Sequence, residues 1–292
     1  MSGGALHNRV WLGAFAALFA LACLGGAAAQ EHPEPRLADP GEIRDTIDTL
    51  ERSLTGKLLV QKAAREWAHE WGEAGLSEFV RWGDTSRTDA VLTRFLNPRT
   101  GEERRERRVT IYLKRGQSPE DRVLDLAHEL VHATSRPSWD PYDPALHAAG
   151  YISAAIEGPG GEVEAVIAEC EVGLELGLSS FPSAARCRGY LEPGQTRLSR
   201  DRVTADFYRS GQWSGLLREK LGARARELPL LSPETPALYS STGKLPYPIA
   251  LYNEFEALNE VACRNSIGRL QSSSAPIRSR ASEFVQSRCR KR

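Results

Sequence analysis

Hydrophobic positions recur at helical spacing over most of the chain and switch to strand-like runs in one stretch. Apolar residues three and four apart predict helices with a buried face in residues 41–72, 202–221 and 249–270. Between residues 76 and 114, short runs rich in β-branched and aromatic residues are typical of strands instead. The pattern predicts an α+β fold that is mostly α-helical, with a small antiparallel sheet.

Three segments carry the strand pattern: 78–82, 90–96 and 108–114. The five residues 97–101, Asn-Pro-Arg-Thr-Gly, have the composition of a turn. The charged run that follows them has mixed sign, and we expect it to be part of a solvated turn. Segment 109–114 alternates apolar and polar residues, which predicts a returning strand that could also pair with an extended substrate at a sheet edge.

The next predicted helix packs against this sheet and has a clear beginning. Ser118 can cap its first turn, Pro119 suits the position after the cap, and Asp121 stands where a reciprocal cap needs an acceptor. Pro137 ends the helix, since proline supplies no backbone N–H for a helical hydrogen bond.

This helix carries the sequence His128-Glu129-Leu130-Val131-His132. Residues four apart lie on one face of a helix, so both imidazoles can bind a single ion. Glu129 points to the side of that pair, where it can reach a water on the metal without ligating the metal. Zinc takes nitrogen, sulfur or oxygen ligands in a tetrahedron, and a catalytic site leaves one position for water. Two histidines therefore leave the site one protein ligand short.

The helix predicted for residues 161–176 offers five glutamates as the missing ligand. Glu162 and Glu169 share a face with small residues, which would let this helix lie close to the histidine helix. We expect Glu162 as the third ligand, with Glu169 as the alternative. The one that does not bind metal could orient a histidine through its other ring nitrogen, and Asp125 is a further candidate for that role. The other three fall on a water-facing side: Glu164, Glu171 and Glu175.

The two motifs together, His128–His132 and Gly161-Glu162-Val163-Glu164-Ala165, resemble the gluzincin branch of the zincin metallopeptidases. The resemblance covers about residues 109–178 and implies a zincin-like core with zinc in a cleft. It also implies that Glu129 is the general base and that a glutamate on the second helix is the third ligand. Several gluzincin families carry an acid or amide four residues after that glutamate. Here the position is Val166, which keeps Glu169 open.

These residues predict a zinc-dependent peptidase with one zinc ion, acting on a protein, a small peptide or a peptidoglycan cross-bridge. The alternative is a non-catalytic cell-envelope protein that binds a peptide or partner and keeps a vestigial or structural metal site. A hydrogen-bond donor for the reaction's oxyanion is also needed. The sequence does not choose among the candidates Tyr151, Tyr208, Tyr239 and His147.

Charge and composition indicate which classes of binding partner to expect. The chain has 38 basic and 38 acidic residues and 41% hydrophobic residues, which fits a globular protein without the basic surplus that nucleic acid or an anionic membrane would require. His69 stands among charged residues with no partner at helical spacing, so we interpret it as solvated. The oligomeric state is not indicated.

The N-terminus has the pattern of an export signal. Arg9 precedes an apolar run, residues 11–24, and three alanines at 27–29 suit cleavage, which predicts a leader of residues 1–29. A lipid anchor on Cys23 is the alternative. Residues 30–292 then form one domain, with its core at about 76–180 and helical extensions on both sides. We expect a periplasmic or extracellular protein without a membrane span.

Export also allows disulfides. Four cysteines remain after the leader, which permits two disulfides in three possible pairings. None of the four has the close spacing of a zinc-binding pair, so we do not assign them to the metal. They are Cys170, Cys187, Cys263 and Cys289.

Overall fold

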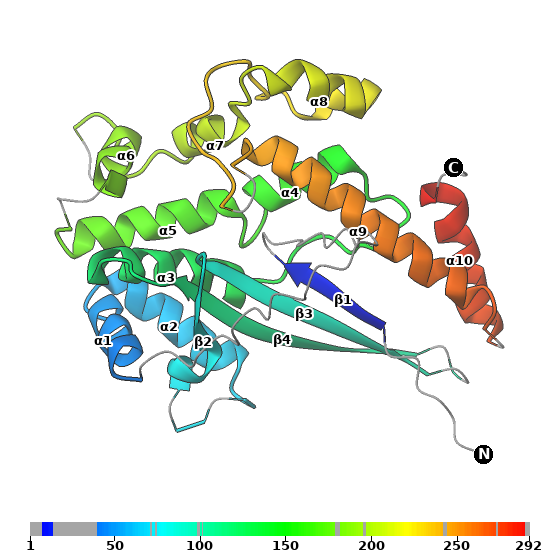
Figure 1. Ribbon diagram of the computed structural model, residues 1–292, viewed down its shortest axis with the longest axis horizontal. Coiled ribbons are helices and arrows are strands. Elements are labelled where there is room, and N and C mark those ends of the chain that lie inside the picture. The colour runs from blue at the N-terminus through cyan, green and yellow to red at the C-terminus, as the bar shows by residue number, and fades with distance from the viewer. Residues whose placement is uncertain are drawn as a thin grey trace, which may run out of the picture.

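A computed structural model describes most of the chain and is mostly helical, which confirms the α+β prediction (Figure 1). The described residues are 8–13, 40–70, 72–73, 75–97, 100, 102–178, 182–194, 197–241, 244–272 and 274–289. Among them, the helices are α1 (Pro40–Leu50), α2 (Leu54–Glu66), α3 (Pro119–Thr134), α4 (Ala148–Glu157), α5 (Glu162–Glu175), α6 (Pro182–Tyr190), α7 (Arg200–Tyr208), α8 (Trp213–Leu221), α9 (Tyr247–Arg269) and α10 (Ala275–Arg288). Two short 3-10 helices, Gly75–Phe79 and Gly222–Glu227, join them.

The sheet is mixed, with the strand order β1-β3-β4-β2. Strands β3 (Arg87–Leu96) and β4 (Glu103–Lys114) form a long antiparallel hairpin, and β2 (Val80–Gly83) pairs with β4 in parallel. The prediction of a small antiparallel sheet holds for the β3–β4 hairpin and is wrong for β2, because alternation of apolar residues identifies a strand but not the direction of its partner. Strand β4 has a neighbour on each side, so the expectation that segment 109–114 pairs with substrate at an edge is also wrong.

The charged run expected as a turn belongs to β4 instead. From Glu103 onward this segment pairs with β3 along the full hairpin. Arginines and glutamates two positions apart lie on the same side of the strand and pair with each other, as Arg105 does with Glu103 and Arg104 with Glu106. Backbone pairing with β3 therefore places this charged segment in the sheet, and its exposed ion pairs contribute little to stability.

Strand β1 (Asn8–Gly13) lies within the predicted leader and pairs antiparallel with β3, from Asp89 to Arg94. The rest of the predicted leader, including Cys23 and the alanines at 27–29, lies outside the described residues. None of the described helices is long and apolar enough to span a membrane.

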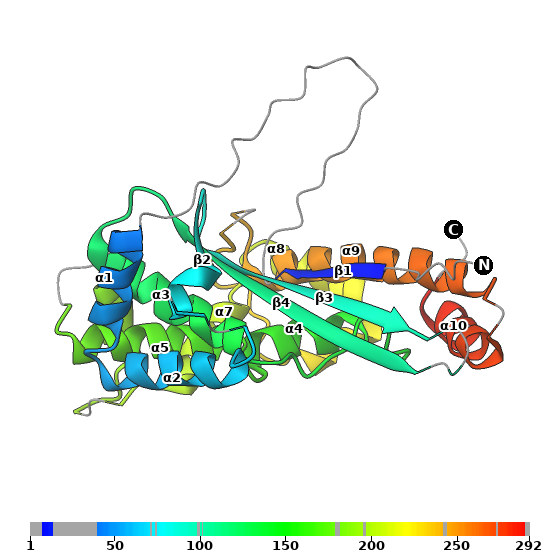
Figure 2. The same cartoon turned by 90° about the horizontal axis from the view of Figure 1, so that it is seen from below.

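Helix α3 lies at the centre of one hydrophobic core and contacts α1, α2, α5, β3 and β4 (Figures 1 and 2). Leu126 and Leu130 of α3 are fully buried in this core, as are Ile111 and Leu113 of β4. The burial explains why the histidine helix keeps one fixed orientation: its apolar face packs on the sheet, while its histidines face α5.

A second core joins α4 and α5 to the helices of the C-terminal half. The helix predicted for 202–221 is two helices, because Gly211 between them adopts a left-handed φ of 55°. Two disulfides brace this half. Cys170–Cys187 joins α5 to α6, and Cys263–Cys289 joins α9 to the end of α10. Both are consistent with an exported protein.

Candidate metal centre

The beginning of α3 shows the predicted cap. Ser118 Oγ accepts a hydrogen bond of 3.1 Å from the Asp121 backbone N–H and donates one of 2.9 Å to the Asp121 carboxylate. The cap fixes where the helix starts, and the buried face fixes its rotation. Together they direct His128 and His132 towards the first residue of α5.

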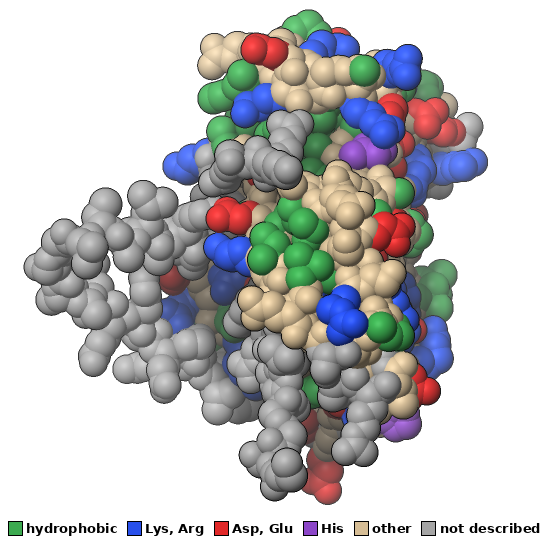
Figure 3. Space-filling model, turned by 90° about the vertical axis from the view of Figure 1, so that its right-hand side faces the viewer, with side chains coloured by type: hydrophobic (Ala, Val, Ile, Leu, Met, Phe, Trp, Pro, Cys, Tyr) green, Lys and Arg blue, Asp and Glu red, His purple; other side chains and the backbone are tan. Residues whose placement is uncertain are grey.

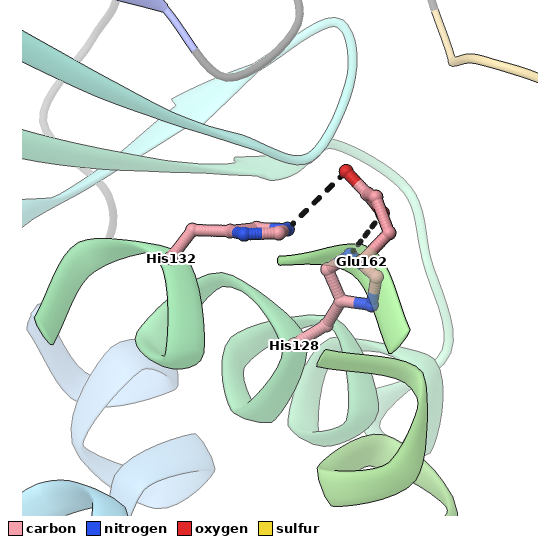
Figure 4. A group of neighbouring side chains, drawn as sticks. All are labelled: His128, His132 and Glu162. Atoms are coloured by element: carbon pink, nitrogen blue, oxygen red, sulfur yellow. Dashed lines mark ion pairs between the residues drawn. The ribbon is translucent and has the colours of Figure 1, made fainter. Parts of the chain in front are cut away.

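Three side chains from α3 and α5 converge at this point (Figure 4). The Nε2 atoms of His128 and His132 each lie 3.5 Å from a different carboxylate oxygen of Glu162. Two ligands bound to zinc at about 2.0–2.1 Å in a tetrahedron lie about 3.3 Å apart, close to these separations. One ligand atom from each of the three residues can be chosen so that all lie within 4.8 Å of one another. The group can therefore hold a metal ion.

Glu162 provides a test of that fit. Its side chain is 1% exposed, and its Oε2 atom is buried without a hydrogen-bond partner. A buried carboxylate oxygen without a partner is costly unless a cation or donor satisfies it. The donor set, two imidazoles and one carboxylate, is a usual one for catalytic zinc.

The second nitrogen of each ring is directed away from Glu162. His132 Nδ1 lies 2.8 Å from the Gly160 carbonyl, and His128 Nδ1 lies 3.3 Å from Glu169 Oε2. Both contacts favour the tautomer that leaves the Nε2 lone pair for a metal. Gly160 has a φ of 69°, and a Cβ there would lie 2.2 Å from the Ser135 side chain, so this turn requires glycine.

Behind His128, Glu169 is held by an arginine from α6. Arg186 Nη2 donates a 2.7 Å hydrogen bond to Glu169 Oε1. Burial works against the charged form of Glu169, but His128 and Arg186 outweigh it and lower the pKa of this carboxyl. The disulfide Cys170–Cys187 joins the residues that directly follow Glu169 and Arg186, so it fixes the two helices at the position of this ion pair.

Asp125 also lies beside the centre, but its hydrogen bonds go elsewhere. Its carboxylate accepts from the Ser86 hydroxyl and, at 2.6 Å, from Gln117 Nε2. Burial raises the pKa of Asp125. Its influence on His128 is thus electrostatic.

Glu129 is buried beside the histidines and is held by one hydroxyl. Thr88 Oγ1, at the start of β3, donates to Glu129 Oε2 at 2.8 Å. Burial raises the pKa of Glu129 to about 8, against the opposing effects of His128 and Thr88. A carboxylate at this position can act as a general base towards a nearby water.

All three metal-ligating candidates line one cleft, and two of them also line a smaller cavity. The cleft, of about 410 Å³, also contains Glu129, Arg186 and Tyr247. The smaller cavity, of about 90 Å³, lies against His132 and Glu162 and is lined mostly, but not only, by apolar groups such as Trp139. The centre is open to solvent through the larger cleft.

Tyr247, the first residue of α9, was not singled out by the sequence. Burial and the neighbouring Glu162 and Glu129 carboxylates raise its pKa well above the usual value. It stands between Pro246 and Pro248 at the start of a long helix, and the two prolines mark the helix start but indicate no chemistry. Only the fold brings it to the cleft.

The oxyanion candidates named from the sequence lie in other environments. Tyr208 donates to Glu157 at 2.6 Å, and His147 caps α4 and lies 3.3 Å from Glu227. Tyr239 is exposed, whereas Tyr151 is buried beside Glu254 and lines the smaller cavity. His69, interpreted as solvated, is exposed.

No family model, curated protein or solved structure matches the chain. The resemblance to the gluzincins therefore stays a prediction from the motif residues.

Proposed function

We propose that this protein is an exported zinc-dependent peptidase that hydrolyses peptide or amide bonds. The observation that carries the proposal is the convergence of His128, His132 and Glu162, with the buried Glu129 beside them in an open cleft. A structural metal site has no need of a carboxylate base next to its ligands, and a site closed by protein would not face a cleft.

A zinc ion held by His128, His132 and Glu162 would supply Lewis-acid polarisation of the scissile carbonyl and a bound water whose pKa is lowered towards about 7. Glu129 takes the proton from the attacking water and passes it to the leaving amine. The Tyr247 hydroxyl lines the same cleft as the three ligands and donates a hydrogen bond to the oxyanion. Glu169, held by Arg186, keeps His128 in the binding tautomer.

Metal content and peptide cleavage test this proposal on the purified protein. We expect one zinc per chain, loss of zinc in His128→Ala, and a Glu129→Gln variant that keeps zinc but loses cleavage. Glu120→Gln is a matched control, because Glu120 is an exposed glutamate on the same helix. Cleavage by Glu129→Gln at the wild-type rate would overturn the proposal. Bound zinc with no cleavage of a diverse peptide mixture by the wild type would favour the non-catalytic envelope protein.

A further inference from the structure

A further cavity lies away from the metal centre, where the β3–β4 hairpin meets the C-terminal helices. It measures about 190 Å³ and is lined by residues of β3, β4, the segment after α3, α9 and α10. This end of the molecule faces the viewer in Figure 3, where basic side chains lie among hydrophobic and acidic ones and form no single broad positive face. The cavity is therefore a local feature, suited to a small group.

Two arginines and two carboxylates of this cavity already neutralise one another. Arg94 pairs with Asp140 and, at 3.4 Å, with Glu103. Arg105 pairs with the same two acids, at 3.1 Å from Asp140. Each carboxylate thus meets two guanidinium groups, and Arg94 is only 3% exposed. These four side chains carry no net charge together, so neither carboxylate is free to neutralise another arginine of the cavity.

Two further arginines line the same cavity without an acidic partner. Among the described residues, neither Arg269 of α9 nor Arg280 of α10 forms an ion pair. Four arginines face two carboxylates, which leaves an excess of two positive charges. The Nε atom of Arg94 is also buried without a hydrogen-bond partner, so the donors around this cavity exceed the acceptors.

Tyr142 positions the guanidinium group of Arg269 beside that of Arg94. The guanidinium carbons of Arg94 and Arg269 lie 4.6 Å and 4.7 Å from the centre of its ring, and Asn265 donates to its hydroxyl at 2.8 Å. A guanidinium stacked on an aromatic ring keeps its N–H groups in its own plane, where they can bind an anion in a bidentate manner. Arg269 is therefore preorganised as a donor, and its charge is not consumed by the ring.

We infer that this cavity binds a phosphate group, either as free phosphate or as a phosphomonoester. A doubly negative tetrahedral anion matches the excess of two charges and offers acceptors to both Arg269 and Arg280. A cavity of about 190 Å³ has room for the five heavy atoms of phosphate. A monocarboxylate would neutralise only half of the excess charge.

The site is separate from the proposed metal centre and does not depend on it. Thr88, which contacts Glu129, and Arg94, which lines the phosphate cavity, are six residues apart on β3, or about 20 Å of extended strand. A His128→Ala variant should therefore bind phosphate like the wild type. Failure of the peptidase proposal would leave this inference untouched.

Calorimetric titration of the purified full chain with inorganic phosphate at low ionic strength tests the inference. We expect one site per chain, weakened about tenfold or more by Arg269→Gln and by Arg280→Gln, because each removes a charge-assisted donor. Arg264→Gln is the matched control. It removes the same charge from α9, but Arg264 pairs with Glu260 and lines a different cavity, so its affinity should stay within about twofold of the wild type.

Two parallel titrations identify the ligand: glycerol phosphate distinguishes a phosphomonoester from free phosphate, and acetate tests whether the cavity prefers phosphate to a carboxylate. Tighter binding of glycerol phosphate than of phosphate would identify a phosphomonoester as the source, and equal binding would identify free phosphate. Phosphate should also raise the melting temperature of the wild type but not that of the Arg269→Gln, Arg280→Gln double variant, whose own melting curve reports its folding. No phosphate binding, equal binding of acetate, or unchanged binding by the folded double variant would each overturn the inference.

Discussion

The affinity for zinc can show which of Glu162 and Glu169 is the third metal ligand. Substituting the residue that contacts the metal should weaken zinc binding more than substituting the residue that contacts His128. Structural zinc in zinc-finger peptides binds with about 10–16 kcal/mol through four protein ligands, so one ligand accounts for roughly 2.5–4 kcal/mol. Glu162→Gln should therefore weaken zinc binding by more than about a hundredfold. Glu169 contacts His128 Nδ1 and not the cluster's centre, so Glu169→Gln should cost about 10–100-fold.

Competition with a chromophoric chelator at fixed pH measures both affinities. Glu171→Gln is the control, because Glu171 lies on the same helix but accepts from Thr55 at its exposed side. Its affinity should match the wild type. A larger loss for Glu169→Gln than for Glu162→Gln would make Glu169 the ligand and refute the assignment. Losses below about threefold in both would refute a metal site at this position.

Three further predictions concern single features of the fold and the centre. Replacing Cys170 and Cys187 with serine should lower the free energy of unfolding by about 3 kcal/mol, from the 17-residue separation, in denaturant titrations; an unchanged midpoint would contradict this. Thr88→Val should slow peptide cleavage about tenfold with zinc content unchanged, because Glu129 loses its hydroxyl donor; wild-type turnover would contradict it. Burial raises the pKa of Glu254 to about 8, so the folded state holds a proton that the unfolded state releases above about 4.5. Stability should fall as pH rises through that window, and Glu254→Gln should flatten the fall in melting curves from pH 5 to 8; an unaltered slope would contradict it.

Local chemistry explains which parts of the centre the sequence predicted. The cap at Ser118 and the four-residue spacing of the histidines have fixed geometry within a helix, whatever surrounds it. The sequence also predicted which face of α5 turns towards α3. Ala165 and Val166 on that face are small enough to let the two helices lie close together, and both are buried. These inferences required no knowledge of distant contacts.

Distant contacts explain what the sequence did not predict. Arg186 and Tyr247 come to the centre from helices far along the chain, and no periodicity links them to His128. The pairing of the cysteines likewise depends on how α6 folds back on α5. The sequence also did not predict the direction of β2, because apolar and polar residues alternate in the same way in parallel and antiparallel strands.

Anomalous diffraction at the zinc absorption edge, from crystals of the purified protein, tests the central claim most directly. The account predicts one strong peak, about 2.0–2.1 Å from Nε2 of both His128 and His132 and about 2.0–2.2 Å from a Glu162 oxygen. A crystal grown with zinc that shows no peak between α3 and α5, or a peak coordinated by other residues, would contradict it.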